Sequence, residues 1–260
     1  MSQFVFAFLI TLVAGLATGI GAILAFFAKK ENALFLSFSM GFSAGVMIYV
    51  SFMEILPSAA DLLQSRHHIL LPIGFFVGIF LIGVIDFVIP KNENPHEFFH
   101  DERDFKKKRY AKLLRSGVLT AFVVAIHNFP EGFATFMSLM QDKTIGVSIA
   151  LAIALHNIPE GIAVSVPIYY ATSSRMKAFL YSFASGFAEP IGAVIGYLLI
   201  LPFLSNCVLS FVFSMTAGIM VYISLDELLP TAREYGKSRL AICGTVIGMI
   251  FMAMTLVMVH

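Results

Sequence analysis

Eight long apolar stretches constrain this chain more than any other feature of its sequence. A helix crosses the hydrocarbon core of a bilayer with about 20 apolar residues, and each stretch is long enough to do so. The chain is 58% hydrophobic and 13% charged, against about 25% charged for a soluble domain. We therefore predict an all-α integral membrane protein with eight transmembrane helices, over roughly residues 4–28, 34–57, 69–90, 117–140, 144–170, 176–201, 204–230 and 239–259.

Positive charge is unevenly distributed between the connections of these spans. The connections after spans one, three, five and seven hold 15 of the 17 Lys and Arg residues, and the opposite side has only Arg66 and Lys143. Loops rich in Lys and Arg stay in the cytoplasm. We therefore expect a multi-pass protein of the cell (inner) membrane with both termini extracytoplasmic and a long cytoplasmic loop over 91–116. The formal net charge of +1 suggests no nucleic-acid partner.

Internal repeats relate the first spans to the last. Residues 43–57 (SAGVMIYVSFMEILP) match residues 216–230 (TAGIMVYISLDELLP) at eight of fifteen positions, which relates span two to span seven at an offset of 173. A weaker match, at an offset of 171, relates 17–22 in span one to 188–193 in span six. Because the paired spans are five apart, the two copies cross the membrane in opposite directions. We expect one transmembrane domain, residues 1–260, in which spans 1–3 and 6–8 form a 3+2+3 inverted repeat around spans 4–5, an arrangement typical of secondary transporters.

Carboxylates inside apolar spans need a partner, because an ionised group in the membrane costs several kcal/mol unless it is paired. Apart from Lys177 and Arg239, at the very start of spans six and eight, no Lys or Arg lies within a predicted span, so the expected partner is a proton or a bound metal. Two interpretations stay open for the acids that occupy equivalent places near the ends of spans two and seven: vestibule or proton-relay carboxylates, or solvated helix ends. Six acids that need such an explanation, in or at the ends of spans, are Glu54, Glu131, Glu160, Glu189, Asp226 and Glu227.

Spans four and five share a motif, His-Asn-x-Pro-Glu-Gly, as IHNFPEG at 126–132 and LHNIPEG at 155–161. In each copy the His and the Glu are four residues apart, so they share one helical face: His127 with Glu131, and His156 with Glu160. The proline has no N–H to donate, which frees a carbonyl and kinks the helix. The closing glycine, at positions 132 and 161, is expected to let spans four and five approach each other closely.

Two such helices side by side supply two imidazoles, two carboxylates and two amide oxygens at mid-membrane depth. This set of nitrogen and oxygen ligands suits Zn²⁺, Fe²⁺, Mn²⁺ or Co²⁺, and the lack of thiolate argues against Cu⁺. Glu189, just before Pro190 in span six, is the next candidate. The predicted metal ligands are therefore His127, Asn128, Glu131, His156, Asn157, Glu160 and Glu189.

The paired motifs resemble those of the ZIP (Zrt/Irt-like) metal transporter family, most closely its bacterial ZupT type. The resemblance covers the whole length, with eight spans, a long third loop and motifs in spans four, five and six. It implies a metal site, often binuclear, on the seven residues named above. It also implies import of zinc, with iron, manganese and cobalt as further substrates, by elevator-like alternating access, and neither a resident cofactor nor enzymatic activity. Asn157 stands where some members carry an acid. The small residues of several spans would also allow a homodimer.

A second metal-binding pattern points to a different class of protein. His96-Glu-Phe-Phe-His100 reads as His-Glu-x-x-His, the signature of zinc metalloproteases. An intramembrane protease needs this motif on a membrane helix, whereas here it follows Pro95 in the most charged stretch of the chain. A stretch of this composition is expected to be a solvated, mobile loop. A regulatory zinc contact at His96 and His100 is the other possibility that stays open.

Overall fold

The computed structural model describes residues 2–27, 32–63, 67–88, 102–200, 205–234 and 237–259. In these ranges eight helical stretches are long and apolar enough to cross a membrane, as the sequence predicts. They are Gln3–Ile23, Ala33–Asp61, Leu70–Val88, Arg109–Met140, Gly146–Thr172, Arg175–Leu198, Asn206–Glu234 and Ser238–Met258. Bulky apolar side chains on their outer faces remain exposed, which suits helices whose solvent is lipid.

Five spans are single α-helices, and three are interrupted. The continuous helices are α1 (Gln3–Ala25), α4 (Leu70–Val88), α5 (Glu102–Gln141), α6 (Lys143–Thr172) and α11 (Ser238–Val259). Span two consists of α2 (Ala33–Val50), the π-helix η1 (Ser51–Ile55) and α3 (Leu56–Asp61). Span six consists of α7 (Arg175–Gly186), α8 (Ala188–Ile195) and the π-helix η3 (Gly196–Ile200). Span seven consists of α9 (Asn206–Ile223), the π-helix η5 (Ser224–Leu228) and α10 (Leu229–Glu234).

The charged stretch before span four is only partly a loop. The sequence predicts a cytoplasmic loop over 91–116, but α5 begins at Glu102 and continues without interruption into the membrane. The expectation of a loop is therefore wrong for the conformation of residues 102–116, which are helical, while the cytoplasmic place of this stretch stays a prediction. The Lys and Arg side chains of this stretch are good helix formers. Residues 91–101, with His96 and His100, lie outside the described residues.

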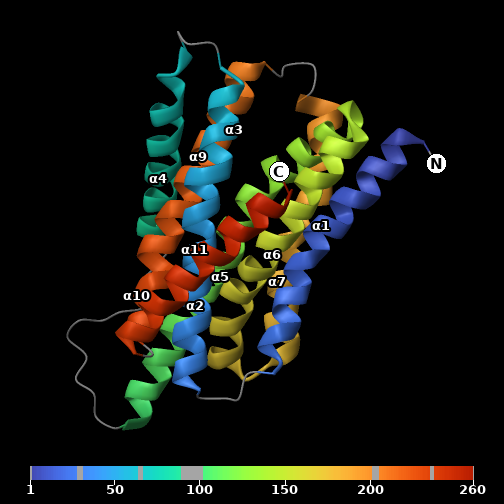
Figure 1. Cartoon of the computed structure of the whole chain (residues 1–260). Coiled ribbons are helices and arrows are strands. Elements are labelled where there is room, and N and C mark those ends of the chain that lie inside the picture. The colour runs from blue at the N-terminus through green and yellow to red at the C-terminus, as the bar shows by residue number, and fades with distance from the viewer. Residues whose placement is uncertain are drawn as a thin grey trace.

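The spans pack as two bundles. The first bundle consists of α1, α5, α6, α7 and α8, and the second of α2, α3, α4, α9, α10 and α11, because each of these helices makes its most extensive contacts within its own group. In Figure 1, α1, α6 and α7 lie on the right and α3, α4 and α9 on the left. A smaller set of contacts, chiefly of α6 with α2 and of α5 with α9, joins the bundles.

Glycines set the close helix contacts inside each bundle. A Cβ on Gly161 would lie 1.9 Å from the carbonyl oxygen of Thr18 on α1, and one on Gly132 would lie 2.1 Å from that of Glu189 on α8. Only glycine allows backbones to approach so closely. The expectation that these two glycines bring spans four and five together is therefore wrong, since they face spans six and one. In the second bundle, Gly45 plays the same role against Thr245.

The two segments of the strongest sequence repeat adopt the same local structure. Each passes from an α-helix into a five-residue π-helix and back, and each resumes just before a proline, Pro57 or Pro230. In Figure 1 the chain rises from α2 to α3 and descends from α9 to α10, so the two segments run in opposite directions. Met47 and Met220, at equivalent positions of the repeat, are fully buried in the apolar core. The full 3+2+3 inverted repeat remains a prediction.

Candidate metal site

The histidines and glutamates of the two motifs pair across helices α5 and α6. His127 Nε2 lies 2.9 Å from Glu160 Oε1, and His156 Nε2 lies 3.1 Å from Glu131 Oε1. Each helix contributes its His to one pair and its Glu to the other, because antiparallel neighbours present the same motif in reverse order. The spacing of four places the two pairs about one helical turn apart in depth, ~6 Å. The two helices therefore form two stacked His–Glu contacts, both buried.

The asparagines tie these helices to their neighbours. Asn128 Nδ2 donates to the carbonyl oxygen of Ser185, 3.3 Å away at the end of α7. Asn157 Nδ2 donates to the carbonyl oxygen of Ala14, 2.9 Å away on α1, and also to the carboxylate of Glu189 on α8. Glu189 thus joins the group expected from the sequence, through Asn157. Both amide groups turn their N–H side to protein and leave their oxygens for another partner.

All seven predicted ligands carry buried atoms that lack a hydrogen-bond partner among the described residues. Leaving such an atom unpartnered costs on the order of 1–3 kcal/mol, so native proteins seldom tolerate it without a bound water or ion. Their concentration here is what a set of metal ligands would show in the absence of metal. The atoms are Nδ1 of His127 and of His156, Oδ1 of Asn128 and of Asn157, and Oε2 of Glu131, of Glu160 and of Glu189.

A cavity of about 440 Å³ leads to one of the two His–Glu pairs. Glu131 and His156 form part of its wall, and it extends between the bundles past Glu54 and Ser58 to Asn206 at the start of α9. His127 and Glu160 do not line this cavity and are fully buried. The two pairs therefore differ in access, with the Glu131–His156 pair open to one end of the bundle. Glu54, at the end of the π-helix of span two, faces the cavity rather than lipid.

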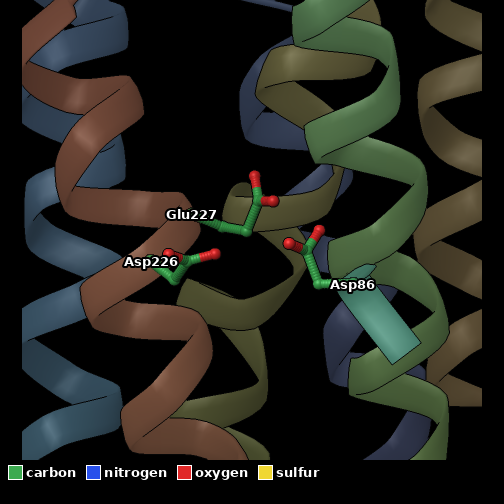
Figure 2. Close-up of side chains that lie close together, drawn as sticks. All are labelled: Asp86, Asp226 and Glu227. Atoms are coloured by element: carbon green, nitrogen blue, oxygen red, sulfur yellow. The ribbon is translucent and has the colours of Figure 1, made fainter. Parts of the chain in front are cut away.

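A second acidic cluster lies at the other end of the bundles. Asp86 of α4 faces Glu227 of η5, with Asp226 beside Glu227 (Figure 2). Their carboxylate oxygens lie within 4.8 Å of one another, which no other trio of His, Cys, Asp or Glu side chains in the described ranges achieves. Arg115 of α5 reaches into this cluster, with Nη2 2.5 Å from Asp86 Oδ1 and Nη1 3.6 Å from Glu227 Oε1.

Arg115 corrects the expectation that the acids in the spans have no cationic partner in the protein. The part of α5 that is long and apolar enough to cross a membrane begins at Arg109, eight residues before the predicted start of span four. Glu227 is therefore paired with a guanidinium, and the solvated helix end proposed for it is wrong, since only 7% of its surface is exposed. Asp86 and Arg115 are absent from the expected set of residues. The sequence offered one signal for Asp86, since it is an acid inside the predicted span 69–90.

Similarity to known proteins agrees with this geometry. The model of the ZIP zinc transporter family matches residues 90–256. The chain is 55% identical over 264 residues to the zinc transporter ZupT of Streptococcus mutans, with 99% of each chain covered. It is 53% identical over 267 residues to the zinc transporter ZupT of Oceanobacillus iheyensis, again with 99% of each chain covered. The chain belongs to the ZIP zinc transporter family.

Membership of the ZIP family decides between the two classes that the sequence suggests. The chain is a multi-pass membrane protein of a transporter family and not an enzyme, so the metalloprotease interpretation of His96-Glu-Phe-Phe-His100 is set aside. The chain is also 50% identical over 280 residues to the zinc transporter ZupT of Clostridium perfringens, and the similarity covers 99% of this chain and 97% of that protein. These similarities extend through both bundles, including α1 to α4, which precede the residues matched by the family model.

Proposed function

We propose that this ZIP family member carries Zn²⁺ across the membrane into the cytoplasm, and that Fe²⁺, Mn²⁺ and Co²⁺ are further substrates. The observation that carries the proposal is the pair of buried His–Glu contacts between α5 and α6. The remaining ligand atoms of these side chains have no partner among the described residues, and the Glu131–His156 pair borders a cavity. Imidazole and carboxylate groups in a site without thiolate are ligands suited to these metals. The names of the relatives add support for zinc.

In the proposed mechanism, a hydrated metal ion enters the cavity from the extracytoplasmic side. Glu54 and Ser58 line its way and attract it with oxygen atoms before it reaches Glu131 and His156. There it exchanges water for the carboxylate and the imidazole, and the His–Glu contact opens to make room for it. The second pair, His127 with Glu160, lies one turn deeper and accepts the ion next. A movement of the first bundle against the second then opens the site to the cytoplasm, as the family resemblance implies.

The seven ligands have separate parts in this proposal. The four His and Glu side chains bind the metal directly, since their imidazole and carboxylate groups are strong metal ligands and lie where α5 and α6 face each other. Asn128, Asn157 and Glu189 complete its coordination with oxygen atoms, while the Asn amide N–H groups hold α5 and α6 against α7 and α1. Neutralising the metal's double charge requires the two carboxylates to be ionised, which is favourable in the membrane only when a cation is present.

The test is uptake of radioactive zinc into proteoliposomes that contain the purified protein. We expect saturable uptake by the wild type and loss of nearly all of it in His127→Ala and in Glu160→Ala. Asp142→Asn is the matched control, because it removes an exposed carboxylate at the turn between α5 and α6 and keeps the oxygen that accepts from Thr144. Full uptake by both site variants would show that the site lies elsewhere. No uptake of any of the four metals by the wild type would refute transport.

A further inference from the structure

Three polar contacts made by α5 join the two bundles at the end opposite to the cavity. Arg115 of α5 contacts Asp86 of α4 and Glu227 of η5, and its Nη2 also donates to the carbonyl oxygen of Asp86, 3.3 Å away. Lys112 of α5 lies 2.8 Å from Glu234 of α10. Between them, Ser116 Oγ of α5 lies 3.4 Å from Thr231 Oγ1 of α10. In every case α5 supplies the side chain from the first bundle, and the second bundle supplies its partner.

These contacts differ in burial, and the difference singles out Arg115. The side chains of Lys112 and Glu234 are 53% and 45% exposed, and an ion pair so open to solvent contributes little. The side chains of Arg115 and Asp86 are 24% and 9% exposed. Separating a half-buried guanidinium from buried carboxylates removes a favourable charge contact from a poorly solvated place, which is unfavourable. The guanidinium of Arg115 lies against Asp86 and Glu227, so we treat these two carboxylates as partners of Arg115 and not as a metal site.

The sequence repeat relates the residues beside Arg115 to residues that line the cavity at the other end. Four residues that line the cavity, Val50, Glu54, Ile55 and Ser58, have counterparts 173 positions later. The counterparts are Ile223, Glu227, Leu228 and Thr231, each less than 9% exposed, and two of them touch the α5 side chains described above. Twelve residues of α5 separate Arg115 from His127, a distance of about 18 Å along a helix. The outer segment of the repeat is therefore open while the inner one is closed.

Resting on the proposed function, we propose that Arg115 is the latch that holds the inner half of the metal path shut. When Arg115 leaves Asp86 and Glu227, the first bundle is free to move, and a second cavity opens along Ile223, Glu227, Leu228 and Thr231. This cavity is the counterpart of the one seen at the other end. Arg115 acts on the bundles and not on the metal, so it is a positioning residue, and its removal shifts the balance between outward-open and inward-open states.

Thiol accessibility tests the latch without measuring transport. In a background with Cys207→Ser and Cys243→Ser, Thr231→Cys reports on the inner cavity and Ser58→Cys on the outer one. A membrane-impermeant thiol reagent is applied to the cytoplasmic face for the first and to the opposite face for the second. In Arg115→Gln we expect labelling of Thr231→Cys to rise about fivefold or more, the lower end of common conformational couplings, and labelling of Ser58→Cys to fall.

Two further variants make the result decisive. The double variant Asp86→Asn/Arg115→Gln removes both charges of the closest pair. It opens the latch without leaving the Asp86 carboxylate separated from Arg115, and it replaces Arg115→Gln in the test if that single variant fails to fold. Lys112→Gln breaks the exposed pair on the same helix and is expected to leave labelling at both positions unchanged. Equal labelling of Thr231→Cys with and without Arg115 would overturn the latch, whereas failure of the unmodified protein to take up zinc would overturn the proposed function separately.

Discussion

At the scale of single residues, the candidate ligands differ in how much of their bonding capacity the protein already uses. His127 and Glu160 each have one hydrogen bond and one atom without a partner in the described part of the chain, and both are fully buried. Glu189 is also fully buried, with one oxygen held by Asn157 and the other unpartnered. A buried carboxylate of this kind is expensive to keep in a membrane unless its free oxygen serves a bound cation. Replacing Glu189 by glutamine removes the negative charge and keeps the size and shape of the side chain, so the effect of the charge can be measured alone.

We therefore expect Glu189→Gln to weaken zinc uptake without unfolding the protein. The glutamine keeps the volume and an oxygen that accepts from Asn157, but it carries no charge for the metal. The KM for zinc should rise about tenfold or more, the size of effect usual when a group that supports a metal site is changed. Uptake kinetics in proteoliposomes measure the KM, and thermal unfolding in detergent serves as the control for folding. A KM equal to that of the wild type would remove Glu189 from the site.

Competition between protons and zinc for the same residues predicts the direction in which zinc uptake changes with pH. Imidazole and carboxylate groups bind metal in their deprotonated forms, so protons compete with zinc for His127, His156, Glu131 and Glu160. With equal pH on both sides of the membrane, the initial rate of zinc uptake should fall as the pH is lowered from about 8 to 5, the range in which histidine commonly changes charge. A rate that rises toward acid pH would contradict direct competition at these side chains.

At the scale of elements, the sequence predicts the existence of all eight spans, because helices in lipid need long apolar runs that few other structures require. It does not predict the three π-helices found in the described ranges, since their wider turn leaves no mark in the hydrophobicity pattern. Nor does it predict which helix partners which. The spacing of His127 and Glu131 shows that they share a face, but not that each would pair with α6. For the same reason the partners of Gly132 and Gly161 were assigned to the wrong helices.

Two glycines of α1, two residues apart, test the close packing of the first bundle. A Cβ on Gly21 would lie 2.1 Å from the carbonyl oxygen of Ile158, within the motif of α6. One on Gly19 would make ordinary contacts with the rings of Phe183, at 3.5 Å, and Phe179, at 3.7 Å. Gly21→Ala should destabilise the protein by about 1–3 kcal/mol, the usual cost of overpacking, and impair uptake. Gly19→Ala should leave both unchanged. Thermal unfolding in detergent compares the two, and equal stability would contradict the packing described.

At the scale of the whole molecule, the two bundles meet differently at their two ends. At one end a cavity separates them, and at the other Arg115 and its neighbours join them. The sequence shows the repeat that relates these ends. It does not predict whether the outward-open or the inward-open state is adopted, because both states use the same residues. Arg115 could not be recognised from the pattern alone, since it stands at the boundary between a charged stretch and an apolar one. Its partners come from two other spans.

The distribution of positive charge predicts which end faces the cytoplasm. Because 15 of the 17 Lys and Arg residues fall in the odd connections, the cavity should open to the outside and both termini should lie there. Alkaline phosphatase fused after the last residue should be active, and green fluorescent protein fused at the same place should stay dark. Fusions at Ser173, in the connection between α6 and α7, should give the opposite pattern and serve as the control. Fluorescence from the C-terminal fusion would reverse the proposed direction of transport.

The central claim is that zinc binds between α5 and α6 through the histidines of the two motifs. X-ray absorption at the zinc edge, on protein loaded with the metal, tests it most directly. We predict nitrogen and oxygen neighbours at about 2.0–2.2 Å with an imidazole signature, and no sulfur at about 2.3 Å. The imidazole signature should disappear in the double variant His127→Ala/His156→Ala and persist in His67→Ala/His68→Ala, which changes histidines of the connection before α4. An unchanged spectrum in the first double variant would contradict the claim.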